Sequence, residues 1–174
     1  MSRTLTLYIA MSLDGYIAGL DDDIRFLNSM EREGEDYGYA AFVQTIDTVI
    51  WGRRTFDKVL SFGGDLPYKD KSVYVISRSR TGSHEHIRYH SDVVSLVKGL
   101  KGQEGAGIYC DGGGQIVTEL QRAGLIDRYI ISIVPYLLGG GVRLFQDAFS
   151  PRHLIFRRSV SFPSGLVQLW YERK

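Results

Sequence analysis

Two adjacent arginines, Arg53 and Arg54, stand where a strand pattern gives way to a helix pattern, which makes them candidates for binding an anion. Cations at a helix start oppose the positive end of the helix dipole, at a cost of roughly 0.3–1 kcal/mol each. A phosphate between the arginines and the helix would offset that cost, because guanidinium binds phosphate in a fork. Arg78, after a neighbouring strand pattern, would close the same pocket. The pattern favours the 2′-phosphate of NADPH over the alternative, two solvated surface arginines.

A run of glycines, Gly112 to Gly114, follows another strand pattern and precedes a helix pattern. Glycine lets the backbone turn sharply and approach a ligand without a Cβ, and the next helix offers free N–H groups to an anion. A pyrophosphate suits both properties, but a tight turn without a ligand explains the glycines equally well. The run is not the spaced G-x-G-x-x-G fingerprint of an NAD-type Rossmann domain.

Proton chemistry would fall to the acidic run Asp21, Asp22 and Asp23, which precedes Ile24-Arg25-Phe26-Leu27. Such a run is typical of a helix start, where carboxylates cap N–H groups and favour the dipole. The functional alternative takes Asp23 as the catalytic residue. Because Asp23 lies on the same helical side as Leu27, its carboxylate would point inward, have a raised pKa and deliver a proton.

Alternating strand and helix patterns position these residues. Apolar runs rich in Val, Ile and Tyr predict strands near Thr4–Met11, Thr48–Gly52, Val73–Ser77 and Gly107–Cys110. Helical patterns run from about Asp36 to Thr45, Arg54 to Leu60, Asp92 to Leu100 and Gln115 to Ala123. Strands separated by helices imply crossover connections and a largely parallel sheet. The segments with the arginines and the glycines then line the carboxyl edge of the strands, where ligands of open α/β sheets bind.

The C-terminal part has strand patterns with no long helical pattern between them: Arg128–Val134, His153–Phe162 and Leu166–Tyr171. Pro163, Ser164 and Gly165 form a turn signal between the last two. We therefore expect antiparallel strands at this end of an otherwise parallel sheet.

Composition indicates an ordinary globular protein. With 174 residues, 44% of them hydrophobic, we expect a single domain over residues 1–174. The lone Cys110 has no internal bridge to form, and no window resembles a signal peptide or membrane span, so we expect a cytoplasmic protein with no membrane partner. The net charge of +1, evenly distributed, gives no reason to expect nucleic acid. His84, His86 and His90 lie in a polar stretch without a second ligand cluster, so we expect no metal.

With these segments in place, the chain resembles the dihydrofolate-reductase-like superfamily, and most closely the reductase domain of the riboflavin-biosynthesis deaminase-reductase. The resemblance covers nearly the whole chain. It rests on short motifs in family order: residues 10–18 (AMSLDGYIA), 52–55 (GRRT), 77–78 (SR), 111–114 (DGGG) and 135–141 (PYLLGGG). The resemblance implies an α/β, three-layer fold with a mostly parallel central sheet and antiparallel C-terminal strands.

The resemblance also implies roles for individual residues toward NADPH. Ala10 and Ile17 would lie against the nicotinamide, and Ser77 and Arg78 would flank the adenosine end. The phosphates would be held by the segment 52–55 and the glycine turn with the helix behind it, that is by Gly52, Arg53, Arg54, Thr55, Asp111, Gly112, Gly113, Gly114, Gln115 and Ile116. In folate reductases the active-site acid falls at the position of Asp23.

The activity implied by the resemblance is reduction of the ribosyl carbonyl of a 5-amino-6-ribosylaminouracil phosphate to the ribityl form by NADPH. A dihydrofolate reductase and a non-catalytic NADPH-binding module are the alternatives. Folate is disfavoured because Gly19-Leu20-Asp21-Asp22 replaces the Met-Pro-Trp-like element, and Lys69 stands near the position of the folate-tail arginine. A single cysteine does not supply the zinc deaminase site. The resemblance also implies a homodimer through the C-terminal strands.

Overall fold

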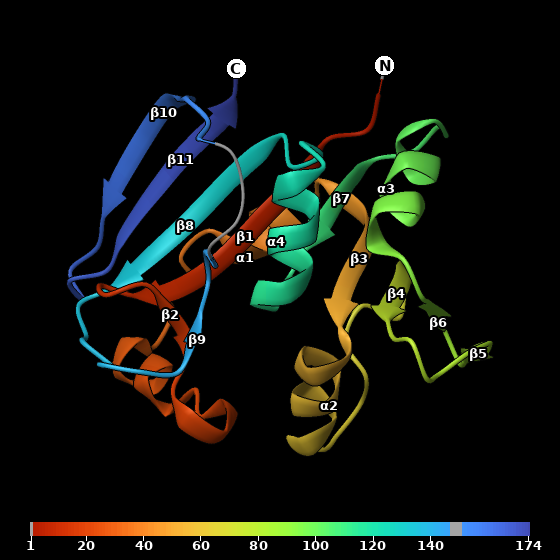
Figure 1. Cartoon of the computed structure of the whole chain (residues 1–174). Helices are drawn as coiled ribbons and strands as arrows, with labels where there is room; N and C mark the ends of the chain where they lie inside the picture. Colours follow the sequence, from red (N-terminus) through yellow and green to blue (C-terminus); the bar gives the residue numbers. More distant parts are fainter. Residues whose placement is uncertain (1, 147–150) are drawn as a thin grey trace.

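The computed structural model describes residues 2–146 and 151–174 and is built around one large sheet (Figure 1). Nine strands are hydrogen-bonded in the order β10-β11-β8-β1-β7-β3-β4-β6-β5. Their bounds are β1 Leu5–Ser12, β3 Ile46–Gly52, β4 Ser72–Ile76, β5 Ser83–His84, β6 Ile87–His90, β7 Gly107–Cys110, β8 Arg128–Val134, β10 Leu154–Ser161 and β11 Val167–Arg173. A separate small sheet pairs β2 (Tyr16–Ala18) with β9 (Val142–Arg143).

Parallel pairing dominates the middle of the large sheet. Strand β1 runs parallel to β7 and β8, and β3 runs parallel to β4 and β7. At the C-terminal end, β11 is antiparallel to both β8 and β10. The predicted arrangement, a mostly parallel central sheet with antiparallel C-terminal strands, is confirmed.

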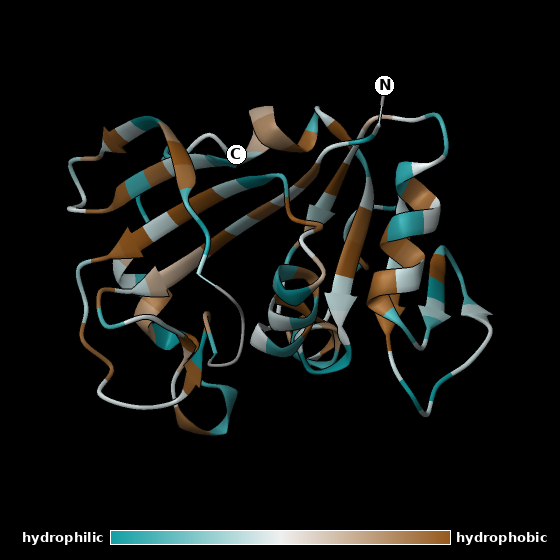
Figure 2. Ribbon diagram, turned by 45° about the horizontal axis from the view of Figure 1, so that its top comes forward, coloured by the Kyte–Doolittle hydropathy of each residue, from teal (hydrophilic) through white to brown (hydrophobic). Residues whose placement is uncertain are grey.

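Helices lie on both faces of the sheet and make three layers (Figure 1). On one face, α3 (Val93–Lys101) and α4 (Gly114–Arg122) pack against buried residues of β1 and β7. On the other face, α1 (Tyr39–Val43) and α2 (Arg53–Ser61) pack against β3 and its neighbours. The strands carry much of the hydrophobic colour in Figure 2, as expected of a sheet covered on both sides. No helix in residues 2–146 and 151–174 has the length and apolarity of a membrane span.

The predicted helix over Asp36–Thr45 is much shorter in the structure, where α1 covers only Tyr39–Val43. The Asp36 carboxylate accepts hydrogen bonds from the N–H groups of Gly38 and Ala40, at 2.8 Å each. Gly38 itself has a φ of +80°, which a helix does not allow. Asp36 therefore organises a turn ahead of the helix instead of beginning it.

The acidic run does not begin an α-helix. It lies in a 3-10 turn, η1 (Leu20–Asp22), followed by a 3-10 helix, η2 (Arg25–Met30). Asp21 and Asp22 both have a φ of +57°, in the left-handed region that a helix-capping residue does not occupy. The short strands β2, β5, β6 and β9 were also not predicted; two of them lie in the histidine-containing polar stretch, where the alternation of apolar residues is brief.

Candidate functional site

The carboxyl ends of β3, β4 and β7 lie together at one sheet edge. Gly52, the last residue of β3, is paired with Ile76 at the end of β4. Its N–H group donates to the carbonyl of Gly112, just beyond β7, at 2.8 Å. The structure thus brings together the segments that begin with Gly52, Ser77 and Asp111, as the sequence predicts.

Gly113 marks the centre of this region. A Cβ placed on Gly113 would lie 3.4 Å from Thr55 Oγ1 and 3.9 Å from Ile17 Cδ1. A Cβ on Gly52 would lie 3.2 Å from the nitrogen of Gly113. We call Gly52, Gly112 and Gly113 the glycine junction. Backbone from two strand ends meets there, between side chains that the sequence assigns to cofactor binding.

Gly114 has a different surrounding from Gly113. A Cβ on Gly114 would lie 2.5 Å from the carbonyl oxygen of Arg143, a contact that a side chain does not tolerate. Close packing against the end of β9 therefore explains this glycine without a ligand. The next residues lie in the first turn of α4, where the Gln115 side chain is exposed and Ile116 belongs to the core. Their roles toward a cofactor rest on backbone N–H groups and stay predictions.

Helices α2 and α4 begin at this edge without a capping side chain. Their N-cap residues are Gly52 and Gly113, and neither supplies a side-chain hydrogen bond. The first N–H groups of an α-helix have no partner within the helix. Two helix starts at the glycine junction therefore present N–H groups that an anion suits.

Carboxylates of the chain already contact the arginines at the start of α2. The Arg54 guanidinium binds Asp22 in a fork, with Nη2 2.7 Å from each carboxylate oxygen. Arg53 Nη1 lies 3.0 Å from Asp57 Oδ2, and Arg80 Nη1 lies 2.7 Å from Asp57 Oδ1. The cost of two cations at a helix start is thus offset by acids of the protein itself, so it does not by itself require a phosphate.

The turn after β4 carries two further arginines. Ser77 is buried, and its Oγ accepts hydrogen bonds from the N–H groups of Ser79 and Arg80, at 3.3 and 3.0 Å. Arg78 is exposed and forms no ion pair within the described part of the chain. Ser77 therefore shapes the turn that presents Arg78. Arg80 was missed from the sequence, although it stands in the same basic segment.

An apolar pocket of about 370 Å³ lies on the sheet face that carries α1. Strands β1 and β8 contribute its floor, η2 and the start of α1 its sides. The residues that define it best are Tyr8, Ala10, Leu27, Met30, Tyr39, Ser132 and Val134. Ala10, assigned to the nicotinamide, is among them, so this pocket is the candidate site of the reacting groups.

Asp111 lies directly before the glycine junction and is held by two donors. The Tyr109 hydroxyl donates to Oδ1 and Trp51 Nε1 donates to Oδ2, each at 2.6 Å. Burial raises the pKa of the Asp111 carboxyl to about 6, although both hydrogen bonds pull it down. The ring of Tyr109 in turn lies edge-on to the ring of Tyr8, with centroids 6.4 Å apart. A protonatable carboxyl is thus linked through Tyr109 to a residue that lines the apolar pocket.

Asp23 differs from its expectation. Its side chain is 38% exposed, and both oxygens contact the Arg25 guanidinium, with Nη2 2.7 Å from Oδ2. Hydrogen bonds from Arg25 lower the pKa of the Asp23 carboxyl to about 2. The expectation of a raised pKa is therefore wrong, because the 3-10 turn that replaces the predicted helix places the carboxyl against Arg25. The catalytic role itself stays a prediction.

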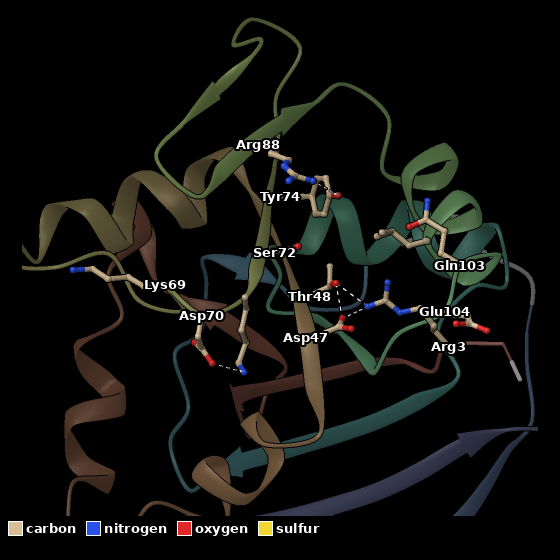
Figure 3. A pocket seen from close by; sticks show the side chains of 12 residues that line it. Arg3, Asp47, Thr48, Lys69, Asp70, Ser72, Tyr74, Arg88, Gln103 and Glu104 are labelled. Atoms are coloured by element: carbon tan, nitrogen blue, oxygen red, sulfur yellow. Dashed lines mark hydrogen bonds and ion pairs between the residues drawn. The ribbon is translucent and has the colours of Figure 1, made fainter.

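A second, polar cavity of about 530 Å³ lies beside the amino ends of β3 and β4 (Figure 3). Four of its charged side chains form two ion pairs. Arg3 binds Asp47, and Lys71 Nζ lies 3.1 Å from Asp70 Oδ2. This opposite edge of the sheet lacks the uncapped helices and the glycine junction, so we place the candidate site at the carboxyl edge.

Comparison with known proteins assigns the family. The model of the RibD C-terminal domain matches residues 3–168, almost the whole chain. The chain belongs to the RibD C-terminal domain family. A relative from Bacillus subtilis (strain 168), the uncharacterized protein YwjB, is 37% identical over 175 residues, which is 99% of each chain. A second from the same strain, YyaP, is 29% identical over 97% of this chain and 94% of its own.

Solved structures agree with this assignment and confirm the dihydrofolate-reductase-like, three-layer fold of RibD reductase domains. A protein from Shewanella sp. PV-4, named after riboflavin biosynthesis, has a TM-score of 0.89 and 32% identity, and the match covers 100% of this chain and 99% of that one. A deaminase/5-amino-6-(5-phosphoribosylamino)uracil reductase from Thermotoga maritima has a TM-score of 0.72 at 15% identity. That match covers 99% of this chain and 57% of the bifunctional protein, and it shows the fold alone.

Proposed function

We propose that this RibD C-terminal domain protein is an NADPH-dependent reductase that converts the ribosyl group of 5-amino-6-(5-phosphoribosylamino)uracil, or of a close analogue, to the ribityl form. The position of Asp111 carries the proposal. Its carboxyl, with a pKa of about 6, directly precedes the glycine junction and binds Tyr109, whose ring contacts Tyr8 of the apolar pocket. These contacts support a proton donor that adjoins the candidate cofactor site and is linked to the candidate substrate pocket.

The residues at the carboxyl edge fit a dinucleotide phosphate. Gly113 leaves a space beside Thr55 and Ile17 that a larger side chain would fill. The uncapped starts of α2 and α4 offer N–H groups to a phosphate. The guanidinium groups of the nearby arginines can bind a phosphate through two parallel hydrogen bonds. We propose that NADPH is bound by Ala10, Ile17, Gly52, Arg53, Arg54, Thr55, Ser77, Arg78, Asp111, Gly112, Gly113, Gly114, Gln115 and Ile116.

The chemistry divides between cofactor and protein. When bound, NADPH would supply the hydride that C1′ of the ribosylamino group accepts. The C1′–O4′ bond of the ribose breaks as C1′ is reduced to CH2, and Asp111 gives its carboxyl proton to O4′, so O4′ becomes the 4′-hydroxyl of the ribityl group and Asp111 becomes a carboxylate. Tyr109 and Trp51 stabilise that carboxylate through their hydrogen bonds, and water returns the proton. The apolar part of the pocket, with Ala10, Leu27 and Val134, would face the reacting carbon, while Glu31, Arg32, Glu35 and Asp36 also line the pocket.

Asp23 is the alternative proton donor, and its surroundings oppose that role. At neutral pH its carboxyl is ionised, because Arg25 lowers its pKa to about 2. To donate a proton it would have to lose Arg25 and gain burial when the substrate binds. Asp111 needs neither change, so we propose it as the donor.

The test measures NADPH binding by titration and NADPH oxidation with two substrates, 5-amino-6-(5-phosphoribosylamino)uracil and dihydrofolate. Oxidation with the uracil substrate alone supports the proposal. Oxidation with dihydrofolate alone would indicate a folate reductase, and binding without oxidation would indicate a non-catalytic module. Failure of NADPH to bind would reject the cofactor and with it the reaction.

Assembly and location are also proposals. Strand β10 is the outermost strand of the sheet, and its Phe156 is 56% exposed. An exposed edge strand with an apolar side chain favours pairing with another chain, which agrees with the homodimer that we propose. Sedimentation equilibrium tests it, and a monomeric mass would reject it. We likewise retain a cytoplasmic location as a prediction, which fractionation of cells tests.

A further inference from the structure

An ion pair joins the turn after β2 to the start of α2, two segments far apart in the sequence. Asp22 lies in η1 and Arg54 in the first turn of α2. Nη2 of Arg54 lies 2.7 Å from both carboxylate oxygens of Asp22, and Nε lies 3.1 Å from Oδ2. The carboxylate thus occupies the fork of the guanidinium, the same group that would bind a phosphate.

The backbone at Asp22 supports a specific role for this contact. Asp22 and the residue before it both have a φ of +57°, a conformation that costs a non-glycine residue free energy. The Asp22–Arg54 contact offsets that cost while it lasts. A ligand that removed Arg54 from Asp22 would therefore also remove one restraint on the turn 19–23.

The position of Arg54 indicates which phosphate would compete with Asp22. The adjacent Thr55 places its Oγ1 3.4 Å from the Cβ position of Gly113, at the glycine junction. Arg53 instead shares Asp57 with Arg80, which follows β4. Arg54 is thus associated with the pyrophosphate position at the centre of the site, and Arg53 with the adenosine end.

We propose that Asp22 is an internal competitor of the cofactor pyrophosphate for Arg54. The inference rests on the proposed function, because it assumes that a dinucleotide binds at the glycine junction. The pyrophosphate and the Asp22 carboxylate exclude each other at one guanidinium, so cofactor binding frees the turn 19–23. Asp22 therefore sets the affinity for the cofactor without contacting it.

The expected effect is modest, because the pair is solvent-accessible. The side chains of Arg54 and Asp22 are 65% and 35% exposed, and exposed pairs contribute little free energy. Removing the carboxylate should tighten cofactor binding about two- to fivefold. NADPH and NADH should gain equally, because both carry the pyrophosphate.

The experiment titrates wild type and Asp22→Asn with NADPH and with NADH, following binding by calorimetry. Asparagine tolerates the left-handed conformation, so the turn should keep its shape. The same substitution in an Arg54→Ala background should produce no tightening, because no guanidinium is left to free. Asp57→Asn controls for the loss of one negative charge beside α2, and it should leave NADH affinity unchanged.

Unchanged or weaker binding in Asp22→Asn would overturn the inference, provided that wild type binds NADPH. Equal tightening of NADH by Asp57→Asn would also overturn it, because the effect would then be a general one of charge. If Asp22→Asn still tightens cofactor binding in the Arg54→Ala background, the inference is also overturned. If no chain binds either cofactor, the proposed function fails first and this inference fails with it.

Discussion

Two aspartates each precede a helix, yet their carboxylates have different tasks. Asp92 precedes α3, and its Oδ1 accepts hydrogen bonds from the N–H groups of Val94 and Ser95 at 2.8 and 3.1 Å. Asp111 precedes α4, but its oxygens accept from Tyr109 and Trp51 in the sheet. Asp92 completes its helix, whereas Asp111 leaves the start of α4 uncapped.

The cause of the difference is the pair of glycines between Asp111 and α4. Asp92 is itself the N-cap of α3, while Gly113 takes that position for α4. The backbone turn at Gly112 and Gly113 separates Asp111 from the helix N–H groups and leaves its carboxyl among aromatic side chains. Asp92 caps α3, and we propose that a ligand completes the uncapped start of α4.

Filling the uncapped helix start should have the largest effect. In Gly113→Val the side chain would occupy the space beside Thr55 and Ile17, so NADPH affinity should fall by about a hundredfold or more, as expected when phosphate contacts are lost. The φ of Gly113 is −83°, which valine allows, so circular dichroism should show a folded protein. Wild-type affinity in this variant would mean that the glycines form only a turn. Gly114→Ala is the matched comparison and should lower stability instead, because its Cβ meets the Arg143 carbonyl.

The uncapped start of α2 is tested by Arg53→Ala. Loss of one arginine–phosphate contact should weaken NADPH binding by roughly ten- to a hundredfold, while NADH binding should change little. Parallel titrations with both cofactors measure the difference. Equal affinities for NADPH and NADH in wild type, unchanged in the variant, would remove the 2′-phosphate assignment.

The surroundings of Asp111 are tested by Tyr109→Phe, which removes one donor and keeps the ring. The Tyr109 hydroxyl lowers the pKa of Asp111, so its loss should raise that pKa above about 6, by on the order of one pH unit. Only the protonated carboxyl donates a proton, so turnover falls as pH rises through the pKa. The descending limb of the pH–rate profile should therefore move to higher pH. If the descending limb of the pH–rate profile stays at the same pH in Tyr109→Phe, the group that titrates is not Asp111.

Asp92 should give the smallest effect. Asp92→Ala removes the cap of α3 and should lower the free energy of unfolding by about 1 kcal/mol, as measured by urea denaturation. NADPH affinity should change far less than in Gly113→Val, because the Asp92 carboxylate is already bound by N–H groups of α3. A loss of cofactor affinity at this position would weaken the contrast between the two aspartates.

The sequence predicts the sheet and the convergence of the cofactor segments, because both follow from apolar runs and from the turns that end them. Turn conformation is harder to predict. The sequence pattern at Asp21 and Asp22 predicts a helix start. Their left-handed φ values instead depend on tertiary contacts such as that between Asp22 and Arg54. Local pattern carries no information about a partner 32 residues away.

The two candidate acids show the same limit. Arg25 stands two positions after Asp23 and forms the ion pair that lowers the Asp23 pKa. The predicted helix placed Asp23 on the side of Leu27 instead, so this ion pair was not predicted. Asp111 was assigned to cofactor binding alone. Burial raises the pKa of its carboxyl, and one hydrogen bond that partly opposes this rise comes from Trp51, which is 60 residues away in the sequence. Tyr109, two positions earlier on the same strand face, was the one local signal.

The most direct test of the account is the pH dependence of single-turnover NADPH oxidation in wild type, Asp111→Asn and Asp23→Asn. Proton donation by Asp111 predicts a wild-type rate that falls above about pH 6. At saturating NADPH, Asp111→Asn should lower the rate by about a hundredfold and abolish that dependence. Asp23→Asn should keep both rate and profile. A wild-type profile in Asp111→Asn, or a hundredfold loss in Asp23→Asn instead, would contradict the assignment of the proton donor to Asp111.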